Sequence, residues 1–217
     1  MKIGICIPSR GLVHSRTMET VLLNLEDVEH ETKFFFAHDK FIPDAQNDIT
    51  KRALKWRAYY IWYVEEDNII PPGTLRAMLK AIRENECGVV AVDYPVGSKN
   101  YSTIATRNGK PMWCGFGCTL VRAFSLSGME QPWFRTDISY RITNKETMEM
   151  EEYDAPSKYG GHDIHFGVMM GKLGIPIYQL PNVVCGHAKM EVWGGRQTNT
   201  GPHEISVFDT IDNKQDY

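Results

Sequence analysis

Residues 59–73, YYIWYVEEDNIIPPG, combine an apolar run, three acids and two prolines. The run at 59–64 contains large β-formers without polar alternation, which predicts a strand that is buried on both faces of a sheet. The three carboxylates at 65–67 follow directly, and they would repel one another unless a cation or a proton neutralised them. The prolines end the strand and can begin a helix. The stretch therefore predicts a carboxylate cluster at the carboxyl edge of a sheet, where open α/β sheets bind ligands.

Strand-like and helix-like segments alternate through the first half of the chain. Apolar runs predict strands at 2–7, 33–37, 59–64 and 88–93. Helices are predicted between them from the apolar spacing of 18–25, after Pro43 with Asp44 as the N-cap, and at 74–83. This order predicts a parallel, doubly wound α/β sheet.

The second half of the chain is less regular. Its pattern predicts a loop or short hairpin at 100–110, a glycine-containing strand at 113–121, a helix at 161–173 and short strands at 175–180 and 183–185. The polar segment 136–161 is either a solvated excursion or a mobile lid, and its residues leave both open. The tail from Trp193 is rich in glycine and asparagine, so we expect it to run along the surface.

The composition is that of an ordinary globular protein. Of the 217 residues, 42% are hydrophobic and 24% are charged, and the net charge of −3 gives no support to nucleic acid or an acidic membrane surface as partner. The five cysteines are scattered without a second thiol pair for zinc, which favours free thiols in a reducing compartment. No apolar run approaches the length of a membrane span, and the apolar start lacks a cleavage-site pattern. We therefore expect a cytoplasmic protein.

Glu65 and Asp67 are the first candidates for chemistry. Because they are two residues apart, they would face the same side of an extended chain, whereas Glu66 would face the other side and hold structure. Mg²⁺ and Mn²⁺ are commonly bound by one or two carboxylates together with substrate phosphates. The alternative is a solvated acidic turn between a strand and a helix. The position after a buried strand is what supports metal or phosphate chemistry.

Asp163 and His187 are the other candidates. Asp163 lies in GGHDIHF, in the first turn of a predicted helix, and is either an N-terminal cap or a general base that accepts a proton from a hydroxyl. His187 follows a strand and a glycine in VVCGHAK, and is either a hydrogen-bonded polar residue or a metal ligand beside carboxylates. His162 and His165 are three apart, but no HExxH-type glutamate accompanies them, which argues against a zinc hydrolase.

Four motifs, taken in order, resemble the GT-A glycosyltransferases, and within them the family 2-like enzymes of bacteria and phages. They are ICIPSRG at 5–11, DAQNDITKRAL at 44–54, YIWYVEEDNIIPPGTL at 60–75 and GGHDIHFGVMMGKLGIPIYQLPNVVCGH at 160–187. The resemblance implies a GT-A-like single domain at 1–190 with a mostly parallel sheet flanked by helices. It divides this domain into a nucleotide-binding half at 1–98 and an acceptor-binding half at 99–190, with an extension at 191–217. The chain has Glu65 where the family has the first aspartate of its DXD motif, and His162 where the family has a glutamate.

The resemblance also implies roles for single residues. Asp67 and His187 would bind Mn²⁺ or Mg²⁺, with Glu65 contacting the metal through water or the donor's ribose. Asp163 would be the catalytic base of an inverting enzyme, and Asp39 corresponds to an acid that hydrogen-bonds uracil. The residues implied in nucleotide-sugar binding are Pro8, Ser9, Arg10, Asp39, Asn47, Glu65, Glu66, Trp113, Gly115 and Gly117. The last three would form the wall and floor of the sugar site.

These roles predict a hexosyl- or pentosyltransferase that moves a sugar from a nucleotide-diphosphate sugar, with UDP favoured, to an acceptor hydroxyl. The acceptor stays open among a glycan, a protein, a small molecule and a modified base in DNA, and no membrane partner is expected. One alternative is a GT-A-like module that binds carbohydrate or nucleotide without catalysis. The other is a sugar-1-phosphate nucleotidyltransferase, which should carry a glycine-rich, basic loop after its first strand; SRGLVHSR at 9–16 is a poor version of one.

Overall fold

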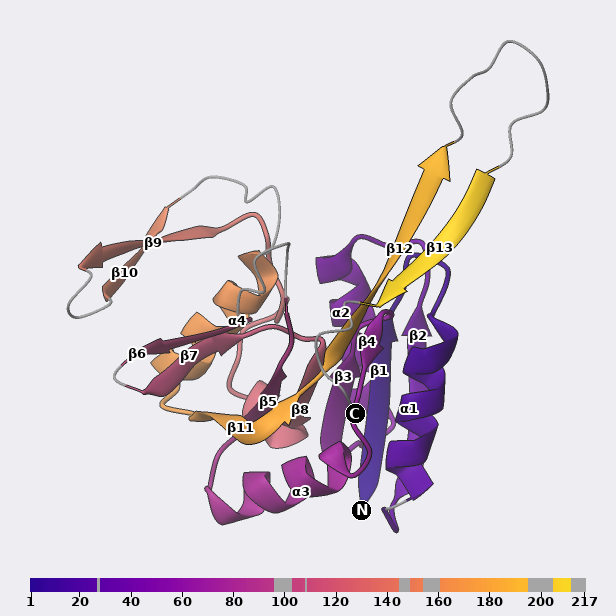
Figure 1. The fold of residues 1–217 in the computed structure, drawn as a ribbon. Helices are drawn as coiled ribbons and strands as arrows, with labels where there is room; N and C mark the ends of the chain where they lie inside the picture. The colour runs from indigo at the N-terminus through magenta and orange to yellow at the C-terminus, as the bar shows by residue number, and fades with distance from the viewer. Residues whose placement is uncertain are drawn as a thin grey trace.

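The centre of the molecule is a six-stranded sheet in the order β11-β5-β8-β3-β1-β2 (Figure 1). The computed structural model describes residues 1–26, 28–95, 103–107, 109–144, 149–153, 161–194 and 205–211. The strands of the central sheet are β1 (Lys2–Pro8), β2 (Glu31–Ala37), β3 (Tyr60–Val64), β5 (Val89–Asp93), β8 (Cys118–Arg122) and β11 (Ile177–Val184).

Helices cover both faces of this sheet. On one face, α2 (Ile42–Lys55) and α4 (Gly161–Lys172) bury residues such as Ile49 and Phe166 in one core cluster. On the other face, α1 (Ser15–Glu26) and α3 (Thr74–Glu84) bury residues such as Val21 and Met78 in a second cluster. The predicted helices at 18–25, 74–83 and 161–173 are confirmed to within a few residues at each end.

Strand β3 belongs to both clusters. Ile61 and Tyr63 pack into the cluster under α2, while Tyr60, Trp62 and Val64 pack into the cluster under α3. Successive side chains of a strand point to opposite faces, so an uninterrupted apolar run fits only a strand that is covered on both sides. The prediction from 59–64 is confirmed, with the strand starting one residue later at Tyr60; the side chain of Tyr59 is half exposed.

The sheet is mostly parallel, with one reversed strand. β1 pairs in parallel with β2 and β3, and β5 pairs in parallel with β11, while β8 lies antiparallel between β3 and β5. The predicted alternation of strands and helices is therefore confirmed. The order of apolar segments in the sequence did not predict that β8, a strand from the second half of the chain, separates β3 from β5.

Three predicted strands of the second half are wrong in their bounds. The segment 113–121 is not one strand, because β7 (Lys110–Cys114) ends before Gly115 and β8 begins after Gly117. β7 pairs with β6 (Ile104–Arg107), which confirms the hairpin alternative for the described part of 100–110. The strands predicted at 175–180 and 183–185 form the single strand β11, whose register against β5 shifts between Gln179 and Val184.

The predicted N-cap of α2 is also wrong. The helix begins at Ile42 with Phe41 at the N-cap position, and no side chain caps it. Asp44 lies inside the first turn instead, where a carboxylate interacts favourably with the helix dipole. Pro43 occupies one of the first two helical positions, as expected for a residue that lacks the N–H group.

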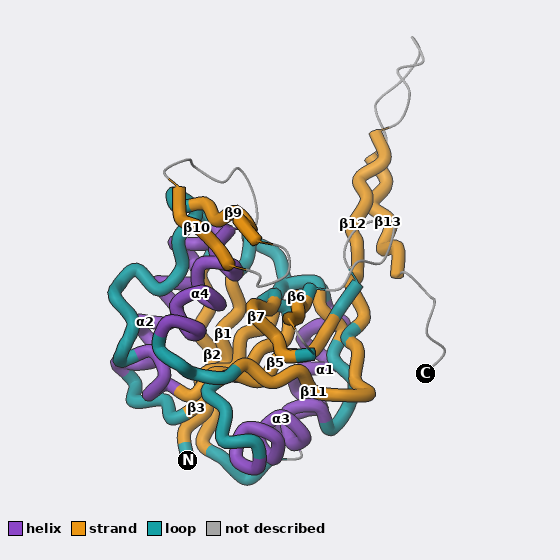
Figure 2. Tube along the Cα trace, turned by 90° about the vertical axis from the view of Figure 1, so that its left-hand side faces the viewer, coloured by secondary structure: helices purple, strands orange, loops and turns teal. Residues whose placement is uncertain are grey.

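Smaller sheets extend from the core. β4 (Asn68–Ile69), β12 (Gly186–Gly194) and β13 (Ile205–Ile211) form a three-stranded sheet, and β12 and β13 project away from the body as a ribbon (Figures 1 and 2). The tail therefore does not run along the surface in its described part. The excursion at 136–161 contains the hairpin of β9 (Ser139–Asn144) and β10 (Glu149–Tyr153), while 145–148 and 154–160 lie outside the described residues. Within the described part of the chain, every helix is too short or too polar to cross a bilayer.

Candidate active site

The acidic turn, residues 65–67, is joined to the second half of the chain at the carboxyl end of β3. The turn closes through a hydrogen bond from the Asn68 N–H to the Glu65 carbonyl at 3.3 Å. β4 then pairs with β12, which places Asn68 opposite His187. The Ala188 N–H donates to the Asp67 carbonyl at 2.7 Å. This short pairing brings His187 next to acids that lie 120 residues earlier in the sequence.

Asp67 and His187 form a close pair. The Asp67 Oδ2 atom lies 3.1 Å from His187 Nε2, and both side chains are largely buried. His187 Nδ1 lies 3.0 Å from the Pro95 carbonyl, which can only accept, so Nδ1 carries a proton. The hydrogen bond to Asp67 raises the pKa of His187, against the opposing effect of burial. If His187 is neutral, its only ring proton is on Nδ1, so the lone pair of Nε2 faces the lone pairs of the Asp67 carboxylate. The contact therefore needs either a proton on Nε2 or a cation between Nε2 and the carboxylate.

The charges of Asp67, His187 and Asp163 all act on Glu65. Burial and, after it, the Asp67 carboxylate raise the pKa of Glu65 to about 7. The charge of Asp163 acts on Glu65 in the same direction, so the two carboxyl groups are within electrostatic reach of each other. The acidic turn is not extended, so the sequence argument for a shared side of Glu65 and Asp67 does not apply as stated. Asp67 lies beside His187, and the charges of both residues act on the Glu65 carboxyl.

Asp163 sits in the first turn of α4. Burial raises the pKa of Asp163 to about 6, while its Oδ1 accepts a hydrogen bond from the Ile164 N–H at 2.8 Å. The carboxyl group therefore has a proton affinity close to that of a general base working near neutral pH. This contact also partly satisfies the helix terminus, so the capping role and the base role are compatible.

The two histidines beside Asp163 do not act as a pair. Burial lowers the pKa of His162 to about 4, so its ring is neutral, and its Nε2 has no hydrogen-bond partner among the described residues. His165 Nδ1 is 2.8 Å from the Tyr140 hydroxyl on β9. This contact joins the β9–β10 hairpin to α4 near Asp163.

The loop after β1 is held by Glu66. The Arg10 N–H donates to Glu66 Oε2 at 2.7 Å, and the Arg10 guanidinium forms an ion pair with the same carboxylate. The His14 N–H donates to the Glu66 carbonyl at 2.9 Å. Glu66 thus points away from the Asp67–His187 pair and supports the loop that carries the predicted nucleotide contacts.

The other predicted nucleotide residues of this loop lie at the same edge. Pro8 and Ser9 are buried, and the Ser9 hydroxyl donates to the Leu12 carbonyl and accepts from the Gly11 N–H. Asp39 is exposed after β2 with a positive φ of 55°. A side chain at Gly11 would lie 3.5 Å from its carboxylate, so the loops after β1 and β2 are neighbours.

Asn47 binds protein groups on three sides. Its Nδ2 donates to the carbonyls of Pro43 and Phe134, both at 2.8 Å, and its Oδ1 accepts from the Phe134 N–H at 3.1 Å. The side chain therefore joins the start of α2 to the backbone before the β9–β10 hairpin. Contact with a nucleotide stays a prediction for this residue.

We expect Asn47→Ala to lower the free energy of unfolding by about 2 to 4 kcal/mol, because three hydrogen bonds are lost and the Phe134 backbone groups are left without partners. Urea denaturation of the ligand-free protein measures this change. Asn85→Ala is the matched control, since the exposed Asn85 side chain donates one hydrogen bond, to the Ala81 carbonyl, and its loss should cost under about 1 kcal/mol. Equal costs for the two variants would contradict the clamping role.

Tyr94 and Asn68 complete the site, and sequence reasoning missed both. The Tyr94 hydroxyl accepts from the Gly117 N–H at 3.2 Å and interacts with Glu65, and Asn68 Nδ2 lies 3.4 Å from Glu65 Oε2. Tyr94 directly follows strand β5, as the acidic turn follows β3. A search for polar groups just beyond each predicted parallel strand would have found it.

The predicted wall and floor of the sugar site lie nearby. Gly115 and Gly117 are buried between β7 and β8, and a Cβ at either would come within 2.5 Å of a Tyr94 atom. Trp113 is half-buried on β7, and its Cβ would lie 2.4 Å from a Cβ at Gly167 of α4. Contact of these residues with a sugar stays a prediction.

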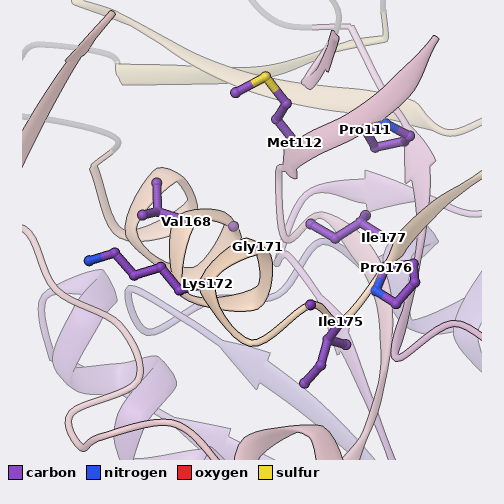
Figure 3. A pocket seen from close by; sticks show the side chains of 10 residues that line it. Pro111, Met112, Val168, Gly171, Lys172, Ile175, Pro176 and Ile177 are labelled. Carbon is purple, nitrogen blue, oxygen red and sulfur yellow. The ribbon is translucent and has the colours of Figure 1, made fainter. Parts of the chain in front are cut away.

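A separate cavity of about 430 Å³ is lined by residues of α4, β7, β11 and the turn before β11 (Figure 3). Its lining includes Met112 from β7, Val168 and Lys172 from α4, and Ile177 from β11. None of the predicted site residues lines it. Within the described ranges, no three His, Cys, Asp or Glu side chains converge closely enough to hold a metal ion by themselves. Any cation at the Asp67–His187 pair would therefore take further ligands from a substrate or from water.

Comparison with known proteins shows the fold. No protein-family model matches the chain, and no curated protein matches it. Among solved structures, A197 from STIV is similar, with a TM-score of 0.62 and 15% identity over 86% of this chain and 85% of that one. The structure of GalNAc-T7 with UDP, GalNAc and Mn²⁺ matches with a TM-score of 0.48 and 10% identity over 86% of this chain and 44% of that one. The predicted α/β fold, with a mostly parallel sheet flanked by helices, is confirmed, and A197 from STIV shares this fold.

Proposed function

We propose that this protein is a glycosyltransferase that transfers a hexosyl or pentosyl group from a nucleotide-diphosphate sugar, with UDP favoured, to an acceptor hydroxyl. The observation that carries the proposal is the Asp67–His187 pair, whose atoms lie 3.1 Å apart at the carboxyl edge of the sheet. The loops after β1 and β2 lie at the same edge, and open α/β sheets bind nucleotides there. We place the protein with the family 2-like enzymes of bacteria and phages on the four motifs in its sequence.

The side chains at this edge suit a divalent cation. The Asp67 carboxylate and the Nε2 atom of His187 face each other and need a positive charge between them. Mn²⁺ and Mg²⁺ are held in many enzymes by one or two protein side chains plus substrate phosphates, so two protein ligands are sufficient in the presence of a diphosphate. When bound, the cation would stabilise the negative charge that develops on the leaving diphosphate.

The remaining residues have distinct roles in this proposal. Glu66 holds Arg10 and the loop that would cover the nucleotide, and Asp39 would bind the base. Asp163 accepts the proton of the acceptor hydroxyl as the oxygen attacks the anomeric carbon of the sugar. A single attack from the face opposite the diphosphate inverts the configuration at that carbon.

The proposal is tested with purified protein, Mn²⁺ and a panel of UDP-, GDP- and dTDP-sugars, with release of the nucleoside diphosphate as the signal. We expect release from at least one UDP-sugar, which EDTA abolishes and added Mn²⁺ or Mg²⁺ restores. Calorimetric titration with UDP and Mn²⁺ adds a binding measurement that does not need the acceptor. Binding without release from any donor would favour the non-catalytic module, and no binding of any nucleotide would reject the proposal.

A further inference from the structure

Glu65 is held by side chains from two different strand ends. Tyr94 follows β5 and is 4% exposed, and Asn68 lies in β4 and has no exposed surface. Asn68 Nδ2 donates toward Glu65 Oε2 at 3.4 Å. The Tyr94 hydroxyl accepts from the Gly117 N–H at 3.2 Å, so its own hydrogen is available to the Glu65 carboxyl that it contacts.

The glycines between β7 and β8 make room for these two side chains. A Cβ at Gly117 would lie 2.4 Å from Asn68 Nδ2 and 2.5 Å from the Tyr94 ring, and one at Gly115 would lie 2.5 Å from the Tyr94 hydroxyl. Real Cβ atoms do not approach other atoms so closely, so any side chain at either position would displace Tyr94 or Asn68. Positions 115 and 117 are therefore glycines because Tyr94 and Asn68 occupy the space that a side chain would need.

Tyr94 also touches the other half of the site. Its ring packs edge-on against the His187 ring, with centroids 5.7 Å apart. The backbone after Tyr94 supplies the Pro95 carbonyl to His187 Nδ1 at 3.0 Å. One short segment thus contacts Glu65 on one side and His187 on the other.

We propose that Tyr94 and Asn68 are positioning residues that fix the Glu65 carboxyl relative to the Asp67–His187 pair, so that Glu65 is preorganised for the donor. This inference rests on the proposed function and adds to it two residues and a reason for Gly115 and Gly117. Preorganisation matters because a carboxyl that must be reoriented on binding lowers the affinity for the ligand.

The contact itself is tested without any ligand, through a cycle of Tyr94→Phe and Glu65→Ala followed by thermal unfolding. Loss of a hydrogen bond to a carboxyl group should lower the Tm of Tyr94→Phe by about 3 to 9 °C. In the Glu65→Ala background the same change should lower the Tm by less than half as much, since only the Gly117 N–H then loses a partner. Tyr63→Phe is the control, because Tyr63 is fully buried and its hydroxyl contacts Thr50 Oγ1 at 2.7 Å on the other face of β3. Its effect should be the same in both backgrounds.

The functional consequence is tested by calorimetric titration of UDP in the presence of Mn²⁺. We expect Tyr94→Phe and Asn68→Ala to weaken UDP binding at least about tenfold, and Tyr63→Phe to stay within about twofold of the wild type. A purely structural role would give Tyr94→Phe and Tyr63→Phe the same affinity at similar losses of Tm, which would overturn the proposal, as would additive Tm changes in the cycle. If the wild type binds neither UDP nor any other nucleoside diphosphate with Mn²⁺, the proposed function fails, and the cycle alone then supports or rejects the Tyr94–Glu65 contact.

Discussion

Asp67→Ala is expected to reduce sugar transfer about a thousand-fold while leaving the protein folded. The variant removes the carboxylate that faces His187 Nε2 at 3.1 Å, and with it one of the two protein ligands proposed for the cation. Charge stabilisation by a bound metal contributes several kcal/mol at the transition state, and each 1.4 kcal/mol changes the rate about tenfold. The hydrogen bond from the Ala188 N–H goes to the Asp67 backbone carbonyl, so the pairing of β4 with β12 survives the change. Steady-state release of UDP from the best donor measures the loss.

Asp48→Ala is the matched control for Asp67→Ala. It also removes a carboxylate that forms ion pairs, at 3.5 Å with Lys40 and 3.3 Å with Arg52, but this carboxylate lies on α2 outside the site. We expect its activity to be unchanged and its stability to fall by under about 1 kcal/mol. Full activity of Asp67→Ala, or of the wild type in excess EDTA, would refute the metal assignment.

Asp163→Asn is expected to lower kcat by about a hundred- to ten-thousand-fold without lowering the Tm. An amide cannot accept the proton of the acceptor hydroxyl, and loss of a general base has effects of this size. Asn can still accept the hydrogen bond from the Ile164 N–H through Oδ1, so the helix terminus keeps its partner. Little loss of rate at an unchanged Tm would instead assign Asp163 to capping alone, because Asn keeps the bond from the Ile164 N–H.

The pH dependence of stability gives a second measurement on Asp163. Its pKa rises from 3.8 to about 6 on folding because of burial, so the folded state binds the proton more tightly than the unfolded state. The contribution of the Asp163 carboxyl to the free energy of unfolding is therefore highest below about pH 4, and it falls as the pH rises through 6. Asp163→Asn removes the ionised form, so its Tm relative to the wild type should be higher at pH 8 than at pH 4.5. Asp44→Asn, in the first turn of α2 and exposed, should show no such gain.

The pH dependence of the rate should also reflect the ionisation of Asp163. A base with a pKa of about 6 is protonated in acid, so kcat/KM of the wild type should fall tenfold per pH unit below about pH 6. In Asp163→Asn the residual rate should lose this acidic limb. An identical limb in the variant would show that another group controls the profile.

Much of the fold could be predicted from local patterns. The apolar run at 59–64 predicts a doubly covered strand because each of its side chains needs an apolar neighbour on its own face, and β3 supplies residues to both core clusters. The start of α2 and the division of 113–121 could not be predicted in this way. Asp44 fits an N-cap as well as a first-turn position, and the break between β7 and β8 depends on Tyr94 and Asn68, which approach from elsewhere in the chain.

The candidate site, like the fold, could be predicted from the sequence only in part. Asp67, Asp163 and His187 could be selected from the sequence because each is a polar group at the end of a strand or the start of a helix, where side chains reach an open edge. The roles implied for them by the family resemblance stay predictions that the variants above test. Tyr94 could have been selected by its position just after a strand, whereas Asn68 could not, because its importance lies in its contact with Glu65 rather than in its own residue type.

The sequence by itself determined that a buried strand ends in three acids and that helices and strands alternate around it. It also determined that Asp163 lies in the first turn of a later helix and that His187 follows a later strand. These properties are local, because strand burial and helix periodicity depend on neighbouring residues. Only the tertiary structure decided which of the three acids meets His187, since β4 must pair with β12 to bring Asp67 to 3.1 Å from its ring and leave Glu66 to Arg10. The choice depends on contacts between residues far apart in the chain, which no local pattern encodes.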